Sequence, residues 1–94
     1  AEERAAAPVL HRALRHGASL IEAGERDPGV VEAALASLVA TEPLVLLDYA
    51  AAVEADTLVS PAALDGDVRL LIAARVGKPR LLDNLGVTVP PSVP

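Results

Sequence analysis

Apolar residues in the first quarter of the chain recur at the spacing of an α-helix. This period predicts a helix over residues 2–23, with one buried stripe made by Leu10, Leu14, Ala18 and Ile21. Pro8 lies beyond the first turn, where a proline costs about 3 kcal/mol, so we expect a kink there. Gly24 is expected to end the helix.

A second helix is predicted to begin at Asp27, whose side chain can cap the helix, with Pro28 at the first helical position. Pro43 is expected to end it, because the residue before a proline is pushed out of the helical region. The residues of its buried stripe are Val31, Leu35, Leu38 and Val39.

After Pro43 the apolar period changes from 3.6 to 2, which is typical of strands. Three strands are predicted, over residues 45–53, 68–76 and 80–89. The last two should pair antiparallel, because only Gly77-Lys78-Pro79 joins them. On the first strand, one face is expected to hold Val45, Leu47, Tyr49, Ala51 and Val53.

The connecting segments are rich in turn residues. Residues 56–66 are predicted as a loop, with one helical turn at residues 62–64, and residues 90–94 as an extended end. Helices first and strands afterwards predict an α+β fold, with two N-terminal helices packed on a small antiparallel sheet of about three strands. A length of 94 residues allows a single domain, over residues 1–94.

Composition excludes several kinds of function. The chain has no cysteine, which excludes a disulfide framework, Cys-ligated zinc and a thiol nucleophile. A net charge of −5 and a single aromatic residue, Tyr49, argue against a nucleic-acid partner. No apolar run approaches the roughly 20 residues that span a bilayer, so we expect no membrane partner. The chain begins at Ala1 and contains no methionine, so we expect it to have been cut from a longer protein.

Histidines and serines are the first candidates for chemistry. His11 and His16 are five residues apart, about 140° around a helix, so they are expected to be exposed rather than to share a metal ion. None of the serines has an evident histidine and aspartate partner; those considered are Ser19, Ser37, Ser60 and Ser92.

The acidic and basic residues mostly have structural interpretations. Asp48 is expected to face solvent on the open side of the sheet, and residues 65–67 to form a turn. Residues 77–80 are predicted to be a hairpin connection rather than a phosphate cradle. Asp83 and Asn84 either hydrogen-bond across the sheet or point into a ligand cleft. The glutamates assigned to solvated helix faces are Glu22, Glu25 and Glu32.

One stretch resembles a known family. Residues 69–77 read RLLIAARVG, and residues 80–84 read RLLDN. This strand-turn-strand pattern is similar to the C-terminal signature of pantothenate synthetases, in which Ala-Ala-Arg-aliphatic-Gly is followed after two residues by Arg-Leu-Ile/Leu-Asp-Asn. Asp48-Tyr49 resembles the family's aspartate-tyrosine strand, and residues 2–7 resemble the start of the helix after its ATP-loop segment.

The resemblance implies a cytoplasmic, ATP-dependent ligase that joins pantoate to β-alanine through a pantoyl adenylate, with magnesium accompanying ATP. It implies that this chain is the lid-like C-terminal domain, inactive alone and without bound ATP or magnesium. The partners it implies are the Rossmann-like N-terminal catalytic domain, absent from this chain, and a second copy in a full-length homodimer.

No catalytic, cofactor-binding or metal residue is carried over from the family, since the motifs that bear those roles are not in this sequence. An alternative from another class stays open: a free-standing α+β interaction module without enzymatic activity. Its docking surface would be the sheet face around Asp48, Arg69 and Arg75.

Overall fold

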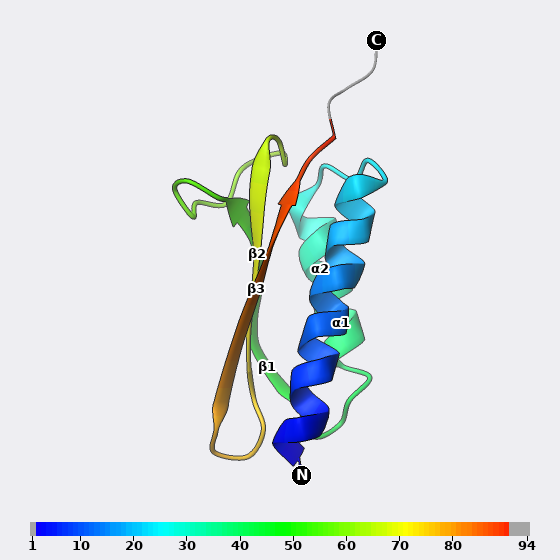
Figure 1. The fold of residues 1–94 in the computed structure, drawn as a ribbon, viewed down its shortest axis with the longest axis vertical. Coiled ribbons are helices and arrows are strands. Elements are labelled where there is room, and N and C mark those ends of the chain that lie inside the picture. Colours follow the sequence, from blue (N-terminus) through cyan, green and yellow to red (C-terminus); the bar gives the residue numbers. More distant parts are fainter. Residues whose placement is uncertain (1, 91–94) are drawn as a thin grey trace.

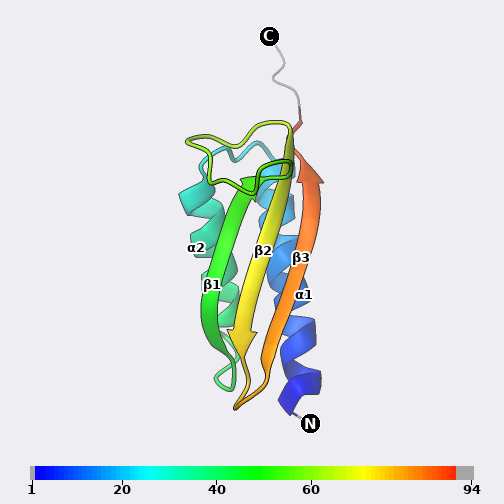
Figure 2. The same cartoon turned by 90° about the vertical axis from the view of Figure 1, so that its left-hand side faces the viewer.

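The computed structural model describes residues 2–90, with side chains from Pro8 onward. Five elements follow one another: α1 (Glu2–Glu22), α2 (Pro28–Val39), β1 (Leu46–Glu54), β2 (Asp67–Arg75) and β3 (Arg80–Thr88). The helices form one layer and the strands a second layer beside it (Figure 1). The strands lie in the order β1-β2-β3, and both neighbouring pairs are antiparallel (Figure 2). The predicted α+β fold is therefore confirmed.

Helix α1 buries the stripe that its sequence predicts. Leu10, Leu14, Ala18 and Ile21 are all buried. The helix continues through Pro8, and the kink expected there stays a prediction. Its end is set by Gly24, which has a φ of +112° and donates its amide to the Ile21 carbonyl at 3.0 Å. Glycine adopts this backbone conformation without a side-chain penalty.

Helix α2 begins as predicted. Asp27 is its N-cap, with an extended backbone, and its Oδ1 accepts the Gly29 amide at 2.8 Å. This bond satisfies one of the amides that the first turn of a helix leaves unpaired. Pro28 occupies the first helical position, where its missing N–H costs nothing.

The predicted end of α2 at Pro43 is wrong. The helix ends at Val39, and the chain continues in turns. Thr41 explains the earlier end, because both its amide, at 3.1 Å, and its hydroxyl, at 2.7 Å, donate to the Leu38 carbonyl. Side-chain bonds of this kind compete with helical pairing. Leu38 itself is only partly buried, unlike the other three members of its predicted stripe.

The core fills the space between the helices and the inner face of the sheet. Val68, Leu70 and Ile72 of β2 meet the buried stripes of both helices there. Gly17 marks the closest approach of α1, since a Cβ at this position would lie 2.8 Å from Leu35 Cδ2 and 3.1 Å from Leu70 Cδ1. The glycine therefore lets α1 lie directly against α2 and β2.

The expected continuous alternation along β1 is wrong, because a β-bulge interrupts it. Leu47 pairs with Ala74, whereas Tyr49 pairs with Ala73, so Asp48 is an extra residue on β1. An inserted residue moves every following side chain to the opposite face. Leu47 accordingly packs against the core before the bulge, and Ala50 and Ala52 do so after it.

The outer edge of β1 is partly covered by α2. Glu32 Oε2 accepts the amide of Ala52 at 2.9 Å, and Ala52 is fully buried. Assigning Glu32 to a solvated helix face is therefore wrong, since its carboxylate satisfies a backbone donor on an edge strand. Pairing such donors also protects an edge from association with other strands.

The two connections within the sheet differ in character. Residues 62–64 form no helical turn, contrary to the prediction, because the Leu64 amide donates at 2.7 Å to the Arg26 carbonyl in the link between the helices. The β2–β3 connection is the predicted hairpin, with Gly77 at a φ of +65° and the Val76 amide donating to the Pro79 carbonyl at 3.1 Å. The expected extended end mostly falls outside the described residues, beyond 90. Between residues 2 and 90, no helix is long and apolar enough to cross a membrane.

Candidate functional site

The sheet face turned away from the helices, which we call the open face, holds the side-chain contacts that link the strands. Its residues alternate along each strand with those that pack on the core. The open face carries two polar clusters, with an apolar row between them. Asp48, Arg69 and Arg75, the residues expected on such a surface, all lie on it.

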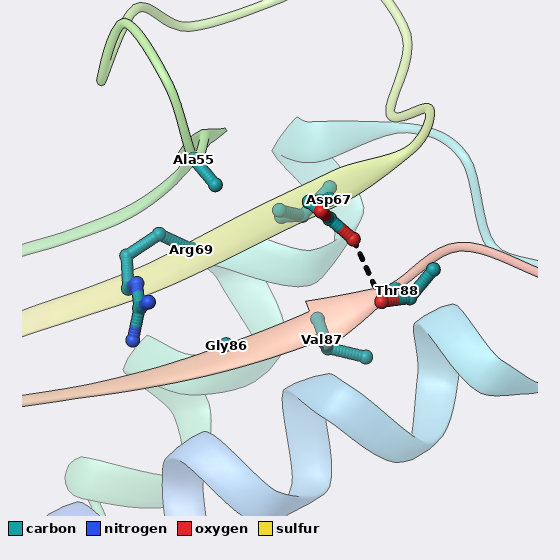
Figure 3. A pocket seen from close by; sticks show the side chains of 7 residues that line it. Ala55, Asp67, Arg69, Gly86, Val87 and Thr88 are labelled. Carbon is teal, nitrogen blue, oxygen red and sulfur yellow. Dashed lines mark hydrogen bonds between the residues drawn. The ribbon is translucent and has the colours of Figure 1, made fainter.

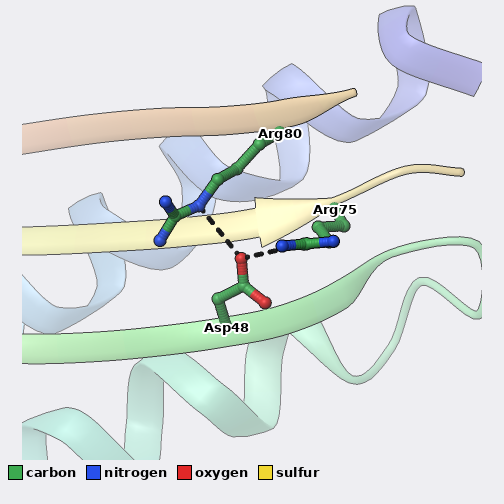
Figure 4. Close-up of polar contacts among 3 residues, drawn as sticks. All are labelled: Asp48, Arg75 and Arg80. Atoms are coloured by element: carbon green, nitrogen blue, oxygen red, sulfur yellow. Dashed lines mark hydrogen bonds and ion pairs between the residues drawn. The ribbon is translucent and has the colours of Figure 1, made fainter. Parts of the chain in front are cut away.

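The first cluster lies at the hairpin end of the sheet and joins all three strands (Figure 4). Asp48 Oδ2 accepts Nε of Arg80 at 3.1 Å and Nε of Arg75 at 3.4 Å. The side chains of the two arginines are half-exposed, at 50% and 57%, and that of Asp48 is 29% exposed. Ion pairs at this exposure stabilise a fold by at most about 1 kcal/mol each.

The bulge in β1 explains how one carboxylate reaches both arginines. Asp48 is the extra residue of the bulge, and β-bulges re-aim side chains at the edges of sheets. The sequence correctly predicted Asp48 on the open side, but not its two ion pairs. The sequence does contain a signal that the two arginines lie together. Arg75 and Arg80 are equally far from the centre of the predicted hairpin turn, so they are expected to face each other across the two strands.

An apolar row crosses the sheet next to this first cluster. Tyr49, Ala73 and Leu82 are register neighbours, one from each strand. Leu82 is 68% exposed and Tyr49 44% exposed, whereas Ala73 between them is buried. This row adjoins the cluster of Asp48, so the hairpin half of the open face combines an apolar surface with positive charge.

The second cluster lies toward the other end of the sheet. Arg69 Nη1 donates to Asn84 Oδ1 at 3.0 Å across the two strands. Gly86, the register partner of Arg69, provides the space, because a Cβ there would lie 3.4–3.5 Å from the guanidinium. Of the two interpretations left open for residues 83–84, the cross-sheet bond holds for Asn84. Asp83 pairs with Ile72 on the helix-facing side, and its Oδ1 accepts the Asn84 amide at 2.8 Å.

A shallow hollow of about 210 Å³ opens beside this second cluster (Figure 3). Arg69 and Gly86 line it on one side, and Asp67 and Thr88 on the other, where the Thr88 hydroxyl donates to Asp67 Oδ1 at 2.8 Å. The Asp67 carboxylate is thus engaged within the sheet. The hollow is open to solvent, and Arg69 contributes to it a guanidinium group that uses one nitrogen, Nη1, toward Asn84.

Among residues 8–90, the candidate histidines and serines are not brought together, and Ser92 lies outside the described residues. His11 and His16 are both exposed on α1, and the Ser19 hydroxyl donates to the His16 carbonyl at 2.7 Å. Across residues 2–90, no three histidine or acidic side chains are grouped in a way that could hold a metal ion. In the described part of the chain, no serine hydroxyl donates to a histidine or carboxylate side chain, and the polar contacts between strands gather on the open face.

Comparison with known proteins gives one consistent result. The family model described as pantoate-beta-alanine ligase matches residues 1–86. A curated relative, pantothenate synthetase 1 of Frankia alni, is 50% identical over 99 aligned residues, which cover 95% of this chain and 33% of the relative. The pantothenate synthetase of Moorella thermoacetica is 42% identical over 94% of this chain and 31% of its own length.

The fold agrees with a solved structure as well. The crystal structure of pantothenate synthetase from Thermus thermophilus superposes with a TM-score of 0.80 at 31% identity, over 89% of this chain and 30% of that protein. This chain therefore spans about a third of the length of these relatives and matches their C-terminal part.

Proposed function

The chain belongs to the pantoate-beta-alanine ligase family, and on that basis we propose that it is the C-terminal, lid-like domain of an ATP-dependent ligase that forms pantothenate. The match over residues 1–86 is the observation that carries the proposal. The length of the relatives supports a ligase made of two portions. Besides the part that matches this chain, each relative has additional sequence about twice as long as that part.

In the proposed reaction, a carboxylate oxygen of pantoate attacks the α-phosphorus of ATP, and diphosphate leaves. The amine of β-alanine then attacks the carbonyl of the pantoyl adenylate, an amide bond forms, and AMP departs. Activation is needed because hydroxide is a far poorer leaving group than AMP. We assign these steps, ATP and its magnesium ion to the longer ligase rather than to this domain alone.

The role proposed for this domain is closure over the substrates. A lid excludes water, which would otherwise hydrolyse an acyl adenylate. The described residues suit such a role, since they form a core of their own and an open face with an apolar row. The partners we propose are the N-terminal catalytic portion, the substrates pantoate, β-alanine and ATP, and a second copy in a homodimer. We place the whole enzyme in the cytoplasm.

The test compares the 94-residue chain with the full-length ligase that contains it. Each is incubated with pantoate, β-alanine and Mg-ATP, and AMP is measured. The full-length enzyme is expected to release AMP only when both substrates are present. The domain alone should release none above background, and AMP release by it would overturn the division of labour. A full-length enzyme without pantoate-dependent AMP release would overturn the proposed activity.

A further inference from the structure

We propose that Arg75 and Arg80, held in place by Asp48, form a binding site for a phosphate or diphosphate group. The inference rests on the proposed function in one respect. In the enzyme, the site would bind the phosphate groups of ATP or of the diphosphate that ATP releases. The hydrogen-bond donors, the charges and the position of the cluster support the site independently of that function.

Both arginines of the cluster have hydrogen-bond donors that no described residue uses. Each arginine uses only its Nε toward Asp48. Among residues 2–90, the terminal Nη nitrogens of both arginines make no hydrogen bond or ion pair. These paired nitrogens form the fork that matches two oxygens of a phosphate. Asp48 therefore orients both guanidinium groups while leaving their forks available.

The cluster of Asp48, Arg75 and Arg80 carries an excess of positive charge. Arg75 and Arg80 are direct register partners on adjacent strands, and like charges placed opposite each other destabilise a sheet. One carboxylate shared between two guanidinium groups leaves a net charge of +1, and Lys78 in the connecting turn adds another cation. This positively charged cluster belongs to a chain with a net charge of −5. An anion would balance the charge that Asp48 leaves uncompensated.

The position of the cluster in the molecule also favours a ligand there. The β2–β3 turn lies at the same end of the molecule as the start of α1 (Figures 1 and 2). Because this chain matches the C-terminal part of its relatives, the preceding portion of the ligase would join at that end. Both arginines lie at the ends of paired strands, which hold side chains more accurately than loops do. The cluster is thus placed to meet a ligand carried by the preceding portion.

The test is a titration of the 94-residue chain with inorganic diphosphate, followed by NMR of the arginine Nε–H signals at constant ionic strength. Saturable shifts of the Arg75 and Arg80 signals are expected. Arg75→Gln and Arg80→Gln should each weaken diphosphate binding about tenfold, since each removes a charge-assisted pair of bonds. Arg12→Gln is the matched control, because Arg12 is an exposed helix arginine and its loss removes the same charge.

Parallel titrations with ATP and acetate identify which chemical group the site binds. Binding of both diphosphate and ATP, with acetate much weaker, supports a phosphate site. Binding of ATP without diphosphate, equal binding of acetate, or an equal effect of Arg12→Gln would each overturn it. Circular dichroism of every variant verifies that it is folded. The titration needs no ligase activity, so an inactive full-length enzyme with a positive titration refutes the proposed function alone. An active full-length enzyme with a negative titration refutes this inference alone.

Discussion

The bond from Glu32 to the edge of the sheet gives the sharpest prediction about stability. Replacing Glu32 with alanine removes the acceptor that lies 2.9 Å from the Ala52 amide. Ala52 is fully buried, so water reaches its amide poorly once the carboxylate is gone. Leaving a buried donor unpaired costs about 1–3 kcal/mol. We expect Glu32→Ala to lower the free energy of unfolding by about 1.5 kcal/mol, within that range.

The assay is urea unfolding followed by far-UV circular dichroism, with a thermal melt beside it. A loss of this size should lower the melting temperature by roughly 6–12 °C, because a domain of under 100 residues shifts by about 4–8 °C per kcal/mol. Glu32→Gln keeps a side-chain oxygen and should recover most of the loss. Glu22→Ala, at an exposed helix position, should change stability by less than about 0.5 kcal/mol. If Glu32→Ala is no more destabilising than Glu22→Ala, the bond to the edge strand contributes nothing and the reasoning is refuted.

Three further predictions concern packing and the open face. Gly17→Val should lower stability by about 2 kcal/mol in the same urea assay, because even its Cβ would crowd Leu35; a neutral result would contradict the close approach of α1. Gly86→Val should displace the Arg69 guanidinium and shift its NMR signals, whereas Gly86→Ala, whose Cβ fits at van der Waals distance, should not. Asp48→Asn should cost about 0.5–1 kcal/mol at low salt and less in about 1 M NaCl, since it leaves two arginines facing each other. A salt-independent cost would argue against an electrostatic origin.

The open face of the sheet has the features that the proposed lid function requires. Its apolar row exposes Leu82 and Tyr49, and the arginine cluster adjoins that row. A lid that closes over a cleft needs a surface of this kind, with aliphatic area to exclude water and fixed polar groups to meet the ligand. The inner face, by contrast, is already filled by the two helices.

The family signature and the open face coincide in space. The strand-turn-strand pattern over residues 69–84 supplies Arg69, Arg75, Arg80 and Asn84, and the aspartate-tyrosine pair supplies Asp48. All five take part in the two polar clusters. The features by which the sequence resembles its family are therefore the features that organise this surface.

Local sequence features were enough to predict the order, type and approximate limits of the five elements. Helix period, the Asp27 cap, the Gly24 stop and strand alternation are local properties, so they are visible without a partner in space. The family was also identifiable in this way, because the signature over residues 69–84 is contiguous. The position of Asp48 on the open side followed from the same alternation, although the bulge there changes the phase of the strand.

Contacts between distant residues settled the remaining features. The packing of α2 against the sheet decides whether Glu32 faces solvent or the edge of β1. Its partner there, Ala52, lies twenty residues further along the sequence. The helical turn expected at residues 62–64 is absent because Leu64 bonds to the link between the helices. Asp48 meets both arginines only when three strands are in register. Periodicity describes one element at a time, whereas register, bulges and shared partners arise when elements meet.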